Sequence, residues 1–314
     1  MIKHKRDFSA KIGDQWIGNG ISYSAYRDGE TPDNDITAKQ HILEDMQILM
    51  QRWQLIRIYG ADEQAENILQ VIAENNLPIK VMQGAWLDAH RTVNENKDQI
   101  DKVIELANTY SDIIIAVNVG NEILVDWAHH RIDDVDIVIR KIRRVRDNIT
   151  QPVSVSDDYN FWNKPEAKLI AAELDFISLH AYAFWNNQPL DSAMQWTVDI
   201  YNSIQEMYPE FTVTYSETGW PTDRILGDGS HEGNLIGVAG EQEQKHYFHE
   251  YNDWVSENNI ISFYFSSFDE SWKGGFDGVN PEAKAEKHWG LFNSDRTPKL
   301  ALQDTKEPQS LVAI

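Results

Sequence analysis

The chain has 314 residues, a composition close to that of soluble globular proteins, and no cysteine. The absence of cysteine excludes a disulfide framework and any thiol nucleophile or thiolate metal site. A formal net charge of −22 argues against nucleic acid as a partner, because such a surface repels phosphate backbones. No run of 18 apolar residues occurs, so we expect no membrane span and no membrane partner.

The first ten residues carry basic side chains but no apolar segment behind them, so we expect no signal peptide in this sequence. The protein is then cytoplasmic if the sequence is complete, and periplasmic or secreted if a signal was removed. No linker or charge block divides the chain. We therefore expect one domain over residues 1–314, with an N-terminal extension at 1–14 and a C-terminal tail at 303–314, acting as a monomer.

Eight short apolar runs alternate with longer amphipathic stretches along the chain. The runs are Trp16–Tyr23, Leu55–Tyr59, Ile79–Leu87, Ile113–Val119, Pro152–Ser156, Leu174–His180, Phe211–Ser216 and Ile261–Phe268. Several are apolar throughout, which is typical of parallel strands covered by helices. Eight β-then-α units predict an α/β fold, a (β/α)8 TIM barrel. The competing open, doubly wound sheet usually carries a G-x-G-x-x-G loop after its first strand, and that pattern is missing here.

The stretches between these runs have helical spacing. Between Val135 and Ile142 the apolar residues follow the i, i+3, i+4, i+7 pattern of one helix face. Thr92 and Glu95 have capping-box spacing ahead of another apolar face at Ile100–Leu106. Both observations support the alternation of strand and helix.

A glutamate stands where the fourth run ends and another where the seventh ends. The two segments read Val119-Gly120-Asn121-Glu122 and Tyr215-Ser216-Glu217. Active residues of TIM barrels lie at the C-terminal ends of the strands, so both side chains should meet at one barrel mouth. Two carboxylates in that position are what cleavage of a glycosidic bond requires. We therefore predict Glu122 and Glu217 as a catalytic pair.

The segment Ser216-Glu217-Thr218-Gly219-Trp220-Pro221, together with Val119-Gly120-Asn121-Glu122, resembles glycoside hydrolase family 17. That family holds β-1,3-glucanases, β-1,3-1,4-glucanases and β-1,3-glucanosyltransferases. Further agreement comes from Arg57-Ile58-Tyr59-Gly60, Phe263-Tyr264-Phe265 and His288-Trp289-Gly290-Leu291-Phe292. The segment at 268–273 looks more like the bacterial and fungal branch than the plant branch. The resemblance covers nearly the whole chain and implies a β-1,3-glucan substrate.

The resemblance also implies unequal roles for the two glutamates. Glu217 would be the nucleophile of a retaining mechanism, and Glu122 would be the acid that later becomes the base, with the carboxyl groups ~5–5.5 Å apart. Glu122 must then hold a proton near neutral pH while Glu217 stays ionised. We expect Arg57 and Tyr59 to donate hydrogen bonds to Glu217, and Asn121 to bind the 2-hydroxyl of the sugar.

Aromatic residues cluster after the strand ends, where flat rings can cover the apolar faces of sugars. His180 either contacts substrate, supports the nucleophile or is structural. The substrate-binding candidates are Asn121, Arg57, Tyr59, Trp86, His180, Tyr182, Trp185, Trp220 and Trp272.

Other polar segments allow more than one interpretation. Asp157-Asp158-Tyr159-Asn160 supplies either sugar contacts or a loop cap. Glu270, Lys273, Glu282 and Lys287 are polar groups of the eighth βα region without an assigned role. Asp126 with His129-His130 lacks metal-site spacing and is interpreted as a surface turn. We expect neither a metal nor an organic cofactor.

The sequence thus predicts a retaining hydrolase that attacks internal β-1,3 linkages of a laminarin-type β-glucan, as polysaccharide or oligosaccharide. A β-1,3-glucanosyltransferase that uses the same residues is the alternative. A third possibility, from a different functional class, is a glucan-binding barrel without activity.

Overall fold

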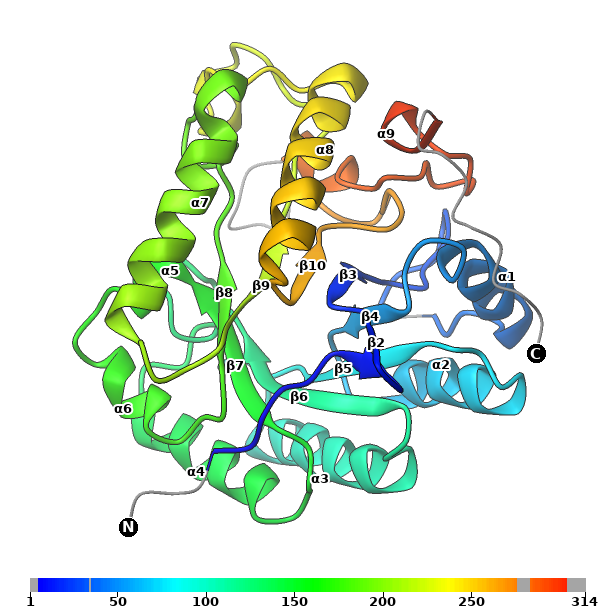
Figure 1. Cartoon of the computed structure of the whole chain (residues 1–314), viewed down its shortest axis with the longest axis vertical. Helices are drawn as coiled ribbons and strands as arrows, with labels where there is room; N and C mark the ends of the chain where they lie inside the picture. Colours follow the sequence, from blue (N-terminus) through cyan, green and yellow to red (C-terminus); the bar gives the residue numbers. More distant parts are fainter. Residues whose placement is uncertain (1–4, 34, 276–282, 304–314) are drawn as a thin grey trace.

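The computed structural model describes residues 5–33, 35–275 and 283–303. Its centre is a closed barrel of eight parallel strands with helices around the outside (Figure 1). Around the barrel the order is β10-β3-β4-β5-β6-β7-β8-β9. The barrel strands are β3 (Asn19–Ser22), β4 (Leu55–Ile58), β5 (Lys80–Ala85), β6 (Ile114–Asn121), β7 (Val153–Asp158), β8 (Ile177–His180), β9 (Val213–Thr218) and β10 (Ser262–Tyr264). The predicted (β/α)8 barrel is confirmed, and each of the eight apolar runs overlaps one of these strands.

Helices follow the strands in the predicted alternation. They are α1 (Lys39–Leu49), α2 (Glu63–Glu74), α3 (Val93–Thr109), α4 (Val135–Arg146), α5 (Tyr159–Trp162), α6 (Ala167–Ala171), α7 (Leu190–Met207), α8 (Glu241–Asn258) and α9 (Leu300–Gln303), with 3-10 turns η1 (Glu232–Asn234) and η2 (Lys284–Lys287). The predicted capping box is present at the start of α3. The backbone N–H of Glu95 donates to the Thr92 hydroxyl at 3.2 Å, and Glu95 accepts from the Thr92 N–H at 2.7 Å. None of the helices in the described part of the chain combines the length and the apolarity needed to cross a bilayer.

Alternate side chains of the barrel strands point into the barrel and outward to the helices, so both faces of each strand are buried. Leu55 and Met82 belong to the cluster inside the barrel, whereas their neighbours Ile56 and Val81 pack with the helices outside. Phe8 of the N-terminal segment joins the inner cluster, with its ring 4.7 Å from that of Phe176. The inner cluster fills the barrel near the N-terminal ends of the strands.

The predicted first run divides into two elements. Trp16 belongs to a small antiparallel hairpin of β1 (Lys11–Ile12) and β2 (Gln15–Trp16), and the barrel strand begins only at Asn19. The indole of Trp16 folds over Gly18, where a Cβ atom would come within 2.6 Å of the ring. The chain therefore turns between the hairpin and the barrel at a residue without a side chain.

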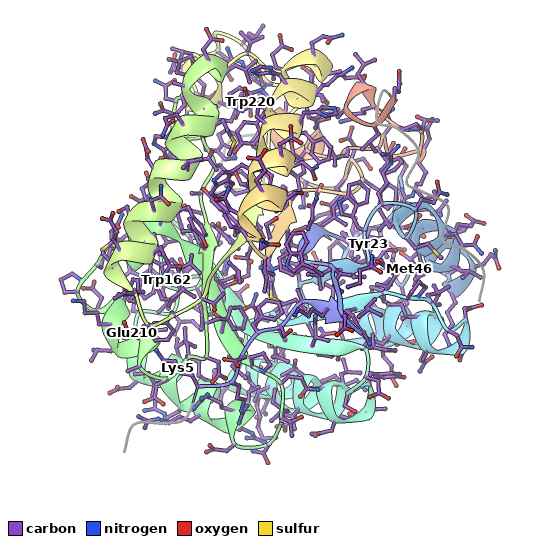
Figure 2. The ribbon with its side chains drawn as sticks, in the orientation of Figure 1. Lys5, Tyr23, Met46, Trp162, Glu210 and Trp220 are labelled. Atoms are coloured by element: carbon purple, nitrogen blue, oxygen red, sulfur yellow. The ribbon has the colours of Figure 1, made fainter. Side chains whose placement is uncertain are left out.

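The N-terminal segment is tied to the outside of the barrel by several contacts. Lys5 donates to the backbone oxygen of Glu210 at 3.2 Å, and the two residues lie together beyond the end of α7 (Figure 2). Arg6 donates to the carbonyl oxygens of Gln151 and Arg146 at 2.9 and 2.7 Å. Since this segment occupies the end where the strands start, the opposite end is left for a site. Residues 304–314 of the predicted tail lie outside the described residues.

Candidate active site

Glu122 stands immediately after β6, in an unusual backbone conformation. Its φ angle is +52°, and that of Gly120 is +99°. The left-handed region is uncommon for a residue other than glycine and persists only where the surroundings hold it. The N–H of Glu122 donates to the Ser156 carbonyl of β7 at 2.8 Å. A Cβ atom on Gly120 would lie 2.4 Å from the Ile123 side chain, so this turn needs glycine. The turn places the Glu122 carboxylate in the barrel mouth.

Asp157 of β7 holds the turn around Glu122 from the neighbouring strand. Its carboxylate accepts the N–H of Leu124 at 2.8 Å and that of Asp158 at 2.9 Å. Asp158 in turn caps α5 by accepting the N–H of Asn160 at 2.9 Å. This segment is therefore a loop cap, one of its two predicted interpretations, and Asp158 and Asn160 also line the cavity described below.

Glu217 lies inside β9 and is held by one side chain from β4 and one from the loop after β8. One carboxylate oxygen accepts a hydrogen bond from the Arg57 guanidinium, and the other accepts from the Tyr182 hydroxyl at 2.6 Å. Arg57 is only 2% exposed and also donates to Oδ1 of Asn121 at 2.5 Å. The two strands that carry the glutamates are thus linked through one buried guanidinium.

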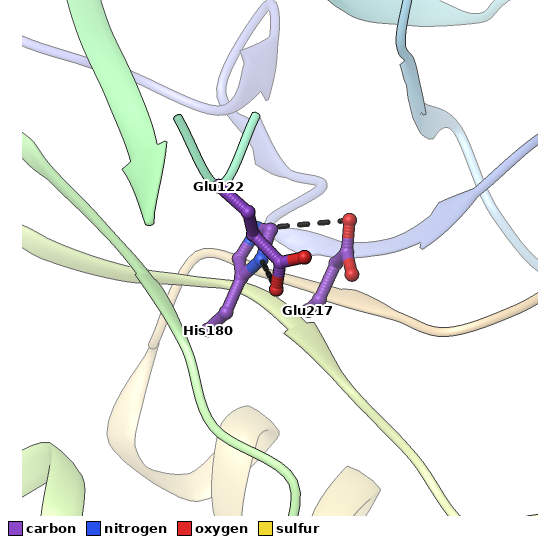
Figure 3. A group of neighbouring side chains, drawn as sticks. All are labelled: Glu122, His180 and Glu217. Carbon is purple, nitrogen blue, oxygen red and sulfur yellow. Dashed lines mark hydrogen bonds and ion pairs between the residues drawn. The ribbon is translucent and has the colours of Figure 1, made fainter. Parts of the chain in front are cut away.

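His180 ends β8 and lies between the two glutamates (Figure 3). Its Nδ1 atom is 3.1 Å from a carboxylate oxygen of Glu122, and its Nε2 atom is 3.6 Å from one of Glu217. One ligand atom from each of the three side chains lies within 4.8 Å of the others. Both oxygens of Glu217 already accept hydrogen bonds, and the Arg57 charge would repel a cation, so this arrangement favours proton exchange over metal binding.

The two carboxyl groups have opposite proton affinities. Burial and the negative charges of Glu217 and Asp158 raise the pKa of Glu122 well above its ordinary value. Burial disfavours ionised Glu217 too, but a positive charge on His180, the Arg57 charge and hydrogen bonds from Tyr182 and Arg57 outweigh it and lower the pKa of Glu217 to about 2. Burial lowers the pKa of His180 to about 4, so the imidazole is neutral near pH 7. Arg57 is then the cation that keeps Glu217 ionised.

The pair opens into a cavity of about 1140 Å³. Both glutamates line it, together with Asn121. Its aromatic lining consists of Tyr23, Tyr26, Tyr59, Trp86, Trp127, Tyr182, Trp185, Phe265, Trp272 and Trp289. Its charged side chains are mostly acidic, so the cavity suits a neutral, hydroxyl-rich molecule better than an anion.

Most of the predicted substrate-binding residues meet around this cavity. Asn121, Tyr59, Trp86, Tyr182, Trp185 and Trp272 all line it. Arg57 and His180 do not: both side chains are buried behind the cavity wall and contact the glutamates instead. The expected hydrogen bond from Arg57 to Glu217 is present. The one expected from Tyr59 is not; Tyr182 makes it, while the Tyr59 ring packs against Arg57 at 4.5 Å.

Trp220 was predicted as a sugar contact, and the structure corrects that prediction. Its side chain is fully buried, and its Nε1 donates to the Val238 carbonyl at 2.8 Å. Its ring packs against Phe184 and Tyr247, Figure 2 shows it near helices α7 and α8, and it does not line the cavity. The reason is strand periodicity: Glu217 faces the mouth, and Trp220, three residues further on, faces the other side.

The eighth βα region contributes a polar group whose role was left open. Lys273 binds Glu270 at 2.6 Å and lies over the Phe265 ring at 4.4 Å. Glu286 of η2 lines the same cavity, and burial raises its pKa to about 7 despite the opposing charge of Lys273. Residue 282 lies outside the described residues. The pattern Glu270-x-x-Lys273 was visible in the sequence, but only the fold brings Glu286 beside it.

His130 and its neighbours are more than the predicted surface turn. His130 stacks on Trp86 with ring centroids 5.0 Å apart, and its Nε2 is 2.7 Å from the backbone oxygen of Asn121. Asp126 binds Lys164 and, at 2.6 Å, Arg131. His130 therefore supports both a cavity aromatic and the strand end that carries Glu122.

Comparisons with known proteins agree with this fold. A glucan 1,3-beta-glucosidase of Arthroderma benhamiae is 25% identical over 277 residues, which covers 86% of each chain. The fold is shared with an endo-laminarinase from Formosa Hel1_33_131 at a TM-score of 0.77 and 23% identity, over 92% of this chain and 87% of that one. It is also shared with a beta-1,3-glucanosyltransferase from Rhizomucor miehei, solved as an active-site mutant with laminaritriose, at a TM-score of 0.73 and 21% identity, over 90% and 96%.

The family assignment rests on a match to a family model that spans most of the chain. Residues 20–290, which run from the first barrel strand to the residue after Trp289, match the family model of the BtgE/BtgC glycoside hydrolase domain. Both glutamates and every cavity-lining residue named above lie within that range. The chain belongs to the BtgE/BtgC glycoside hydrolase domain family.

Proposed function

We propose that this chain hydrolyses internal β-1,3-glucosidic linkages of a laminarin-type β-glucan with retention of the anomeric configuration. Glu217 is the nucleophile and Glu122 the acid and base. The observation that carries the proposal is the pair itself: two adjacent carboxyl groups with opposite proton affinities in an aromatic cavity. A glycosidase needs one protonated and one ionised carboxyl group at the same bond.

The separation of the pair supports retention rather than inversion. One oxygen of each carboxylate lies within 4.8 Å of the other and of His180. Retaining glycosidases have carboxyl groups about 5–5.5 Å apart, whereas inverting ones need about 6.5–9.5 Å to admit a water molecule between them. The short distance leaves room for the sugar carbon but not for an additional water on the far face.

In the first step a carboxylate oxygen of Glu217 attacks the anomeric carbon, and the bond from that carbon to the leaving oxygen breaks. Glu122 gives its proton to the leaving oxygen, so the departing sugar leaves as an alcohol. The products are a glycosyl ester on Glu217 and an ionised Glu122. Charge is conserved, because one carboxylate has become an ester and the other has lost its proton.

In the second step Glu122 takes a proton from water, and the water oxygen attacks the same carbon. The ester bond to Glu217 breaks and its carboxylate returns, held by Arg57 and Tyr182. Asn121 binds the sugar 2-hydroxyl: Arg57 holds its Oδ1, which leaves the Nδ2 amide to donate. A contact to that hydroxyl strengthens in the transition state.

The substrate class is supported by the relatives and by the cavity. The fungal relative is a glucan 1,3-beta-glucosidase, and two proteins of the same fold are an endo-laminarinase and an enzyme solved with laminaritriose. A volume of about 1140 Å³ exceeds the usual ~300–1,000 Å³ of small-ligand pockets, so several sugar rings fit. Trp127, 60% exposed on the loop after β6, extends the lining to the rim, as an endo-acting enzyme needs.

A product time course tests this proposal. Laminarin and reduced laminarihexaose are incubated with the enzyme, and the new anomers are followed by proton NMR from the first minutes. We expect mixed short oligosaccharides whose first reducing ends are β. An initial α-anomer would contradict the nucleophile assignment, and release of glucose alone from the outset would contradict endo attack.

A β-1,3-glucanosyltransferase is the second candidate, and one feature of the cavity favours it. Trp86 and Trp127 line the side of the mouth that carries Glu122, where the leaving sugar departs and where an acceptor sugar would bind. In that case a sugar hydroxyl replaces water in the second step. Products longer than the starting oligosaccharide, as the main outcome of the same time course, would establish transfer over hydrolysis.

A further inference from the structure

In the described part of the molecule, His180 is the only side chain within 4 Å of charged or polar atoms of both catalytic candidates. It is 0% exposed, so it cannot exchange partners with water. Strand pairing sets its place: His180 is the register partner of Asp158 on β7 and of Glu217 on β9. The imidazole therefore lies between the carboxyl groups as a consequence of the barrel itself (Figure 3).

A neutral imidazole offers one donor and one acceptor, on different ring nitrogens. With the proton on Nδ1, the ring would donate to Glu122 and direct its Nε2 lone pair at Glu217. With the proton on Nε2, it would donate toward Glu217 and accept from Glu122. Glu217 is the anion of the pair, because Arg57 and Tyr182 both donate to it. A lone pair facing that anion is unfavourable, so the second tautomer is the consistent one.

We propose that His180 is a positioning residue held as the Nε2–H tautomer. It accepts a hydrogen bond from protonated Glu122 at Nδ1 and turns its Nε2–H toward ionised Glu217, 3.6 Å away and beyond hydrogen-bond length, and so favours the single proton of the pair on Glu122. The inference rests on the proposed function of the two glutamates. It explains the difference in proton affinity between the two glutamates by a third side chain that contacts both.

The same tautomer serves both half-reactions without itself losing or gaining a proton. In the resting enzyme it stabilises protonated Glu122. In the glycosyl-enzyme, Glu122 is ionised and faces the Nδ1 lone pair, which makes it a stronger base toward water. Once Glu122 is protonated again, the hydrogen bond to Nδ1 re-forms. His180 therefore acts through Glu122 and Glu217 and touches no reacting atom of the sugar.

Other charged and titratable groups face this cluster and are part of the balance. Arg57 lies on β4 and Asp158 on β7, and Tyr182 is the second residue after the end of β8. Lys273 and Glu286 act from the far side of the cavity. None of them contacts both glutamates as His180 does, so their replacement should move one limb of the pH profile and not both in opposite directions.

Two substitutions separate the two halves of the proposal. Glutamine places an amide near the Nε2 position, so His180→Gln keeps a donor toward Glu217 and loses the acceptor for Glu122. Asparagine places its amide near the Nδ1 position, so His180→Asn keeps an acceptor for Glu122 and loses the donor. The kcat/KM for laminarihexaose, whose leaving sugar needs the proton of Glu122, is measured against pH for both variants, for His180→Ala and for the unsubstituted enzyme.

We expect the basic limb of His180→Gln to move down by about one pH unit, because Glu122 then loses its proton more easily. We expect the acid limb of His180→Asn to move up by a similar amount, and His180→Ala to narrow the profile from both sides. An equal loss at every pH in all three variants would show a merely structural role and overturn the proposal. So would an upward shift of the basic limb in His180→Gln.

A spectroscopic measurement on the unsubstituted protein keeps the inference testable if a variant does not fold. The chain, which has ten histidines, is labelled with ¹⁵N-histidine. The ring-nitrogen signals of His180 are assigned as those missing from the spectrum of a folded His180 variant. Alternatively, they are assigned as those that do not change between pH 5 and 8. We expect a protonated Nε2 and an unprotonated Nδ1; the reverse would overturn the proposal. This readout needs no substrate, so it remains decisive if laminari-oligosaccharides are not cleaved, which would instead contradict the proposed function.

Discussion

Glu122 and Glu217 face one another across the mouth, yet the two regions that carry them are constructed differently. Glu217 lies within a regular strand and receives two hydrogen bonds, from Arg57 and Tyr182. Glu122 lies just beyond its strand at a φ of +52°, and its half-buried carboxyl group meets only His180 among the side chains that hydrogen-bond to it in the described residues. One region is rich in donors, the other nearly free of them.

This difference explains how two identical side chains can do different chemistry. A carboxylate that receives two donors and a cation keeps its charge, whereas one in a poorly solvated turn beside other carboxylates keeps its proton. The strained turn is part of that arrangement, because it removes Glu122 from the donors that a regular strand position would meet. The predictions below remove individual parts of each region.

The largest effect should come from Glu217→Gln, which removes the nucleophile while keeping the shape of the side chain. We expect kcat/KM on laminari-oligosaccharides to fall by about 10⁴- to 10⁶-fold, as for nucleophiles of other covalent mechanisms. Circular dichroism would check that the fold is intact. A folded variant that retained more than a tenth of the activity would show that Glu217 is not the nucleophile.

Glu122→Ala should lower the rate on natural glucan by about 10²- to 10⁴-fold, the usual contribution of acid–base catalysis. An aryl glycoside with a good leaving group needs little protonation, so its first step should suffer far less. Burst kinetics on such a substrate would separate the two steps. Equal losses on both substrates would argue against a proton-transfer role.

Arg57→Lys keeps the charge but replaces the planar guanidinium that reaches both Glu217 and Asn121. Losing these bonds raises the pKa of Glu217 above about 2, so the acid limb of kcat/KM should move to higher pH and the rate should fall by about 10- to 100-fold. Arg296→Lys is a matched control, because Arg296 is also buried and paired, with Asp45, but neither lines the cavity nor contacts either glutamate. If the acid limb of the pH profile did not move in Arg57→Lys, Arg57 would not be the group that keeps Glu217 ionised.

Asp157→Ala removes the acceptor of two buried N–H groups around the Glu122 turn. Leaving such groups unsatisfied should lower the free energy of unfolding by about 1–3 kcal/mol, measured by urea titration. We also expect a lower kcat, because the turn loses its support. Asp134→Ala, which removes the cap of α4 on the surface, should lower stability without changing kcat. Similar kcat values in both variants would contradict the role of Asp157.

The smallest effect is expected for the cavity aromatics. Trp185→Ala should raise KM for laminari-oligosaccharides by about 2- to 10-fold, the worth of one stacking contact. Trp220→Phe should lower the melting temperature and leave KM unchanged, since Trp220 is buried away from the cavity. A raised KM in Trp220→Phe, with no effect in Trp185→Ala, would show that Trp220 and not Trp185 contacts the sugar.

Much of this organisation could be predicted from the sequence, and the errors have a common form. The periodicity of the apolar runs predicted the barrel, and barrel geometry then placed Glu122 and Glu217 together. The sequence also suggested Arg57 as a donor to Glu217. It suggested Tyr59 where Tyr182 serves, and Trp220 where the cavity uses Trp289. These errors concern which of several nearby side chains reaches across the mouth.

The amino-acid sequence by itself determined the strands, the helices and the two glutamates, because these depend on local periodicity and on the position of a residue along its own strand. Only the tertiary structure decided that the two glutamates differ in proton affinity. That difference in pKa depends on groups from other segments of the chain, namely Arg57, His180, Tyr182 and Asp157, and on burial that no single segment creates. Proton affinity is set by the surroundings of a carboxyl group in three dimensions, so it emerges only when the barrel closes.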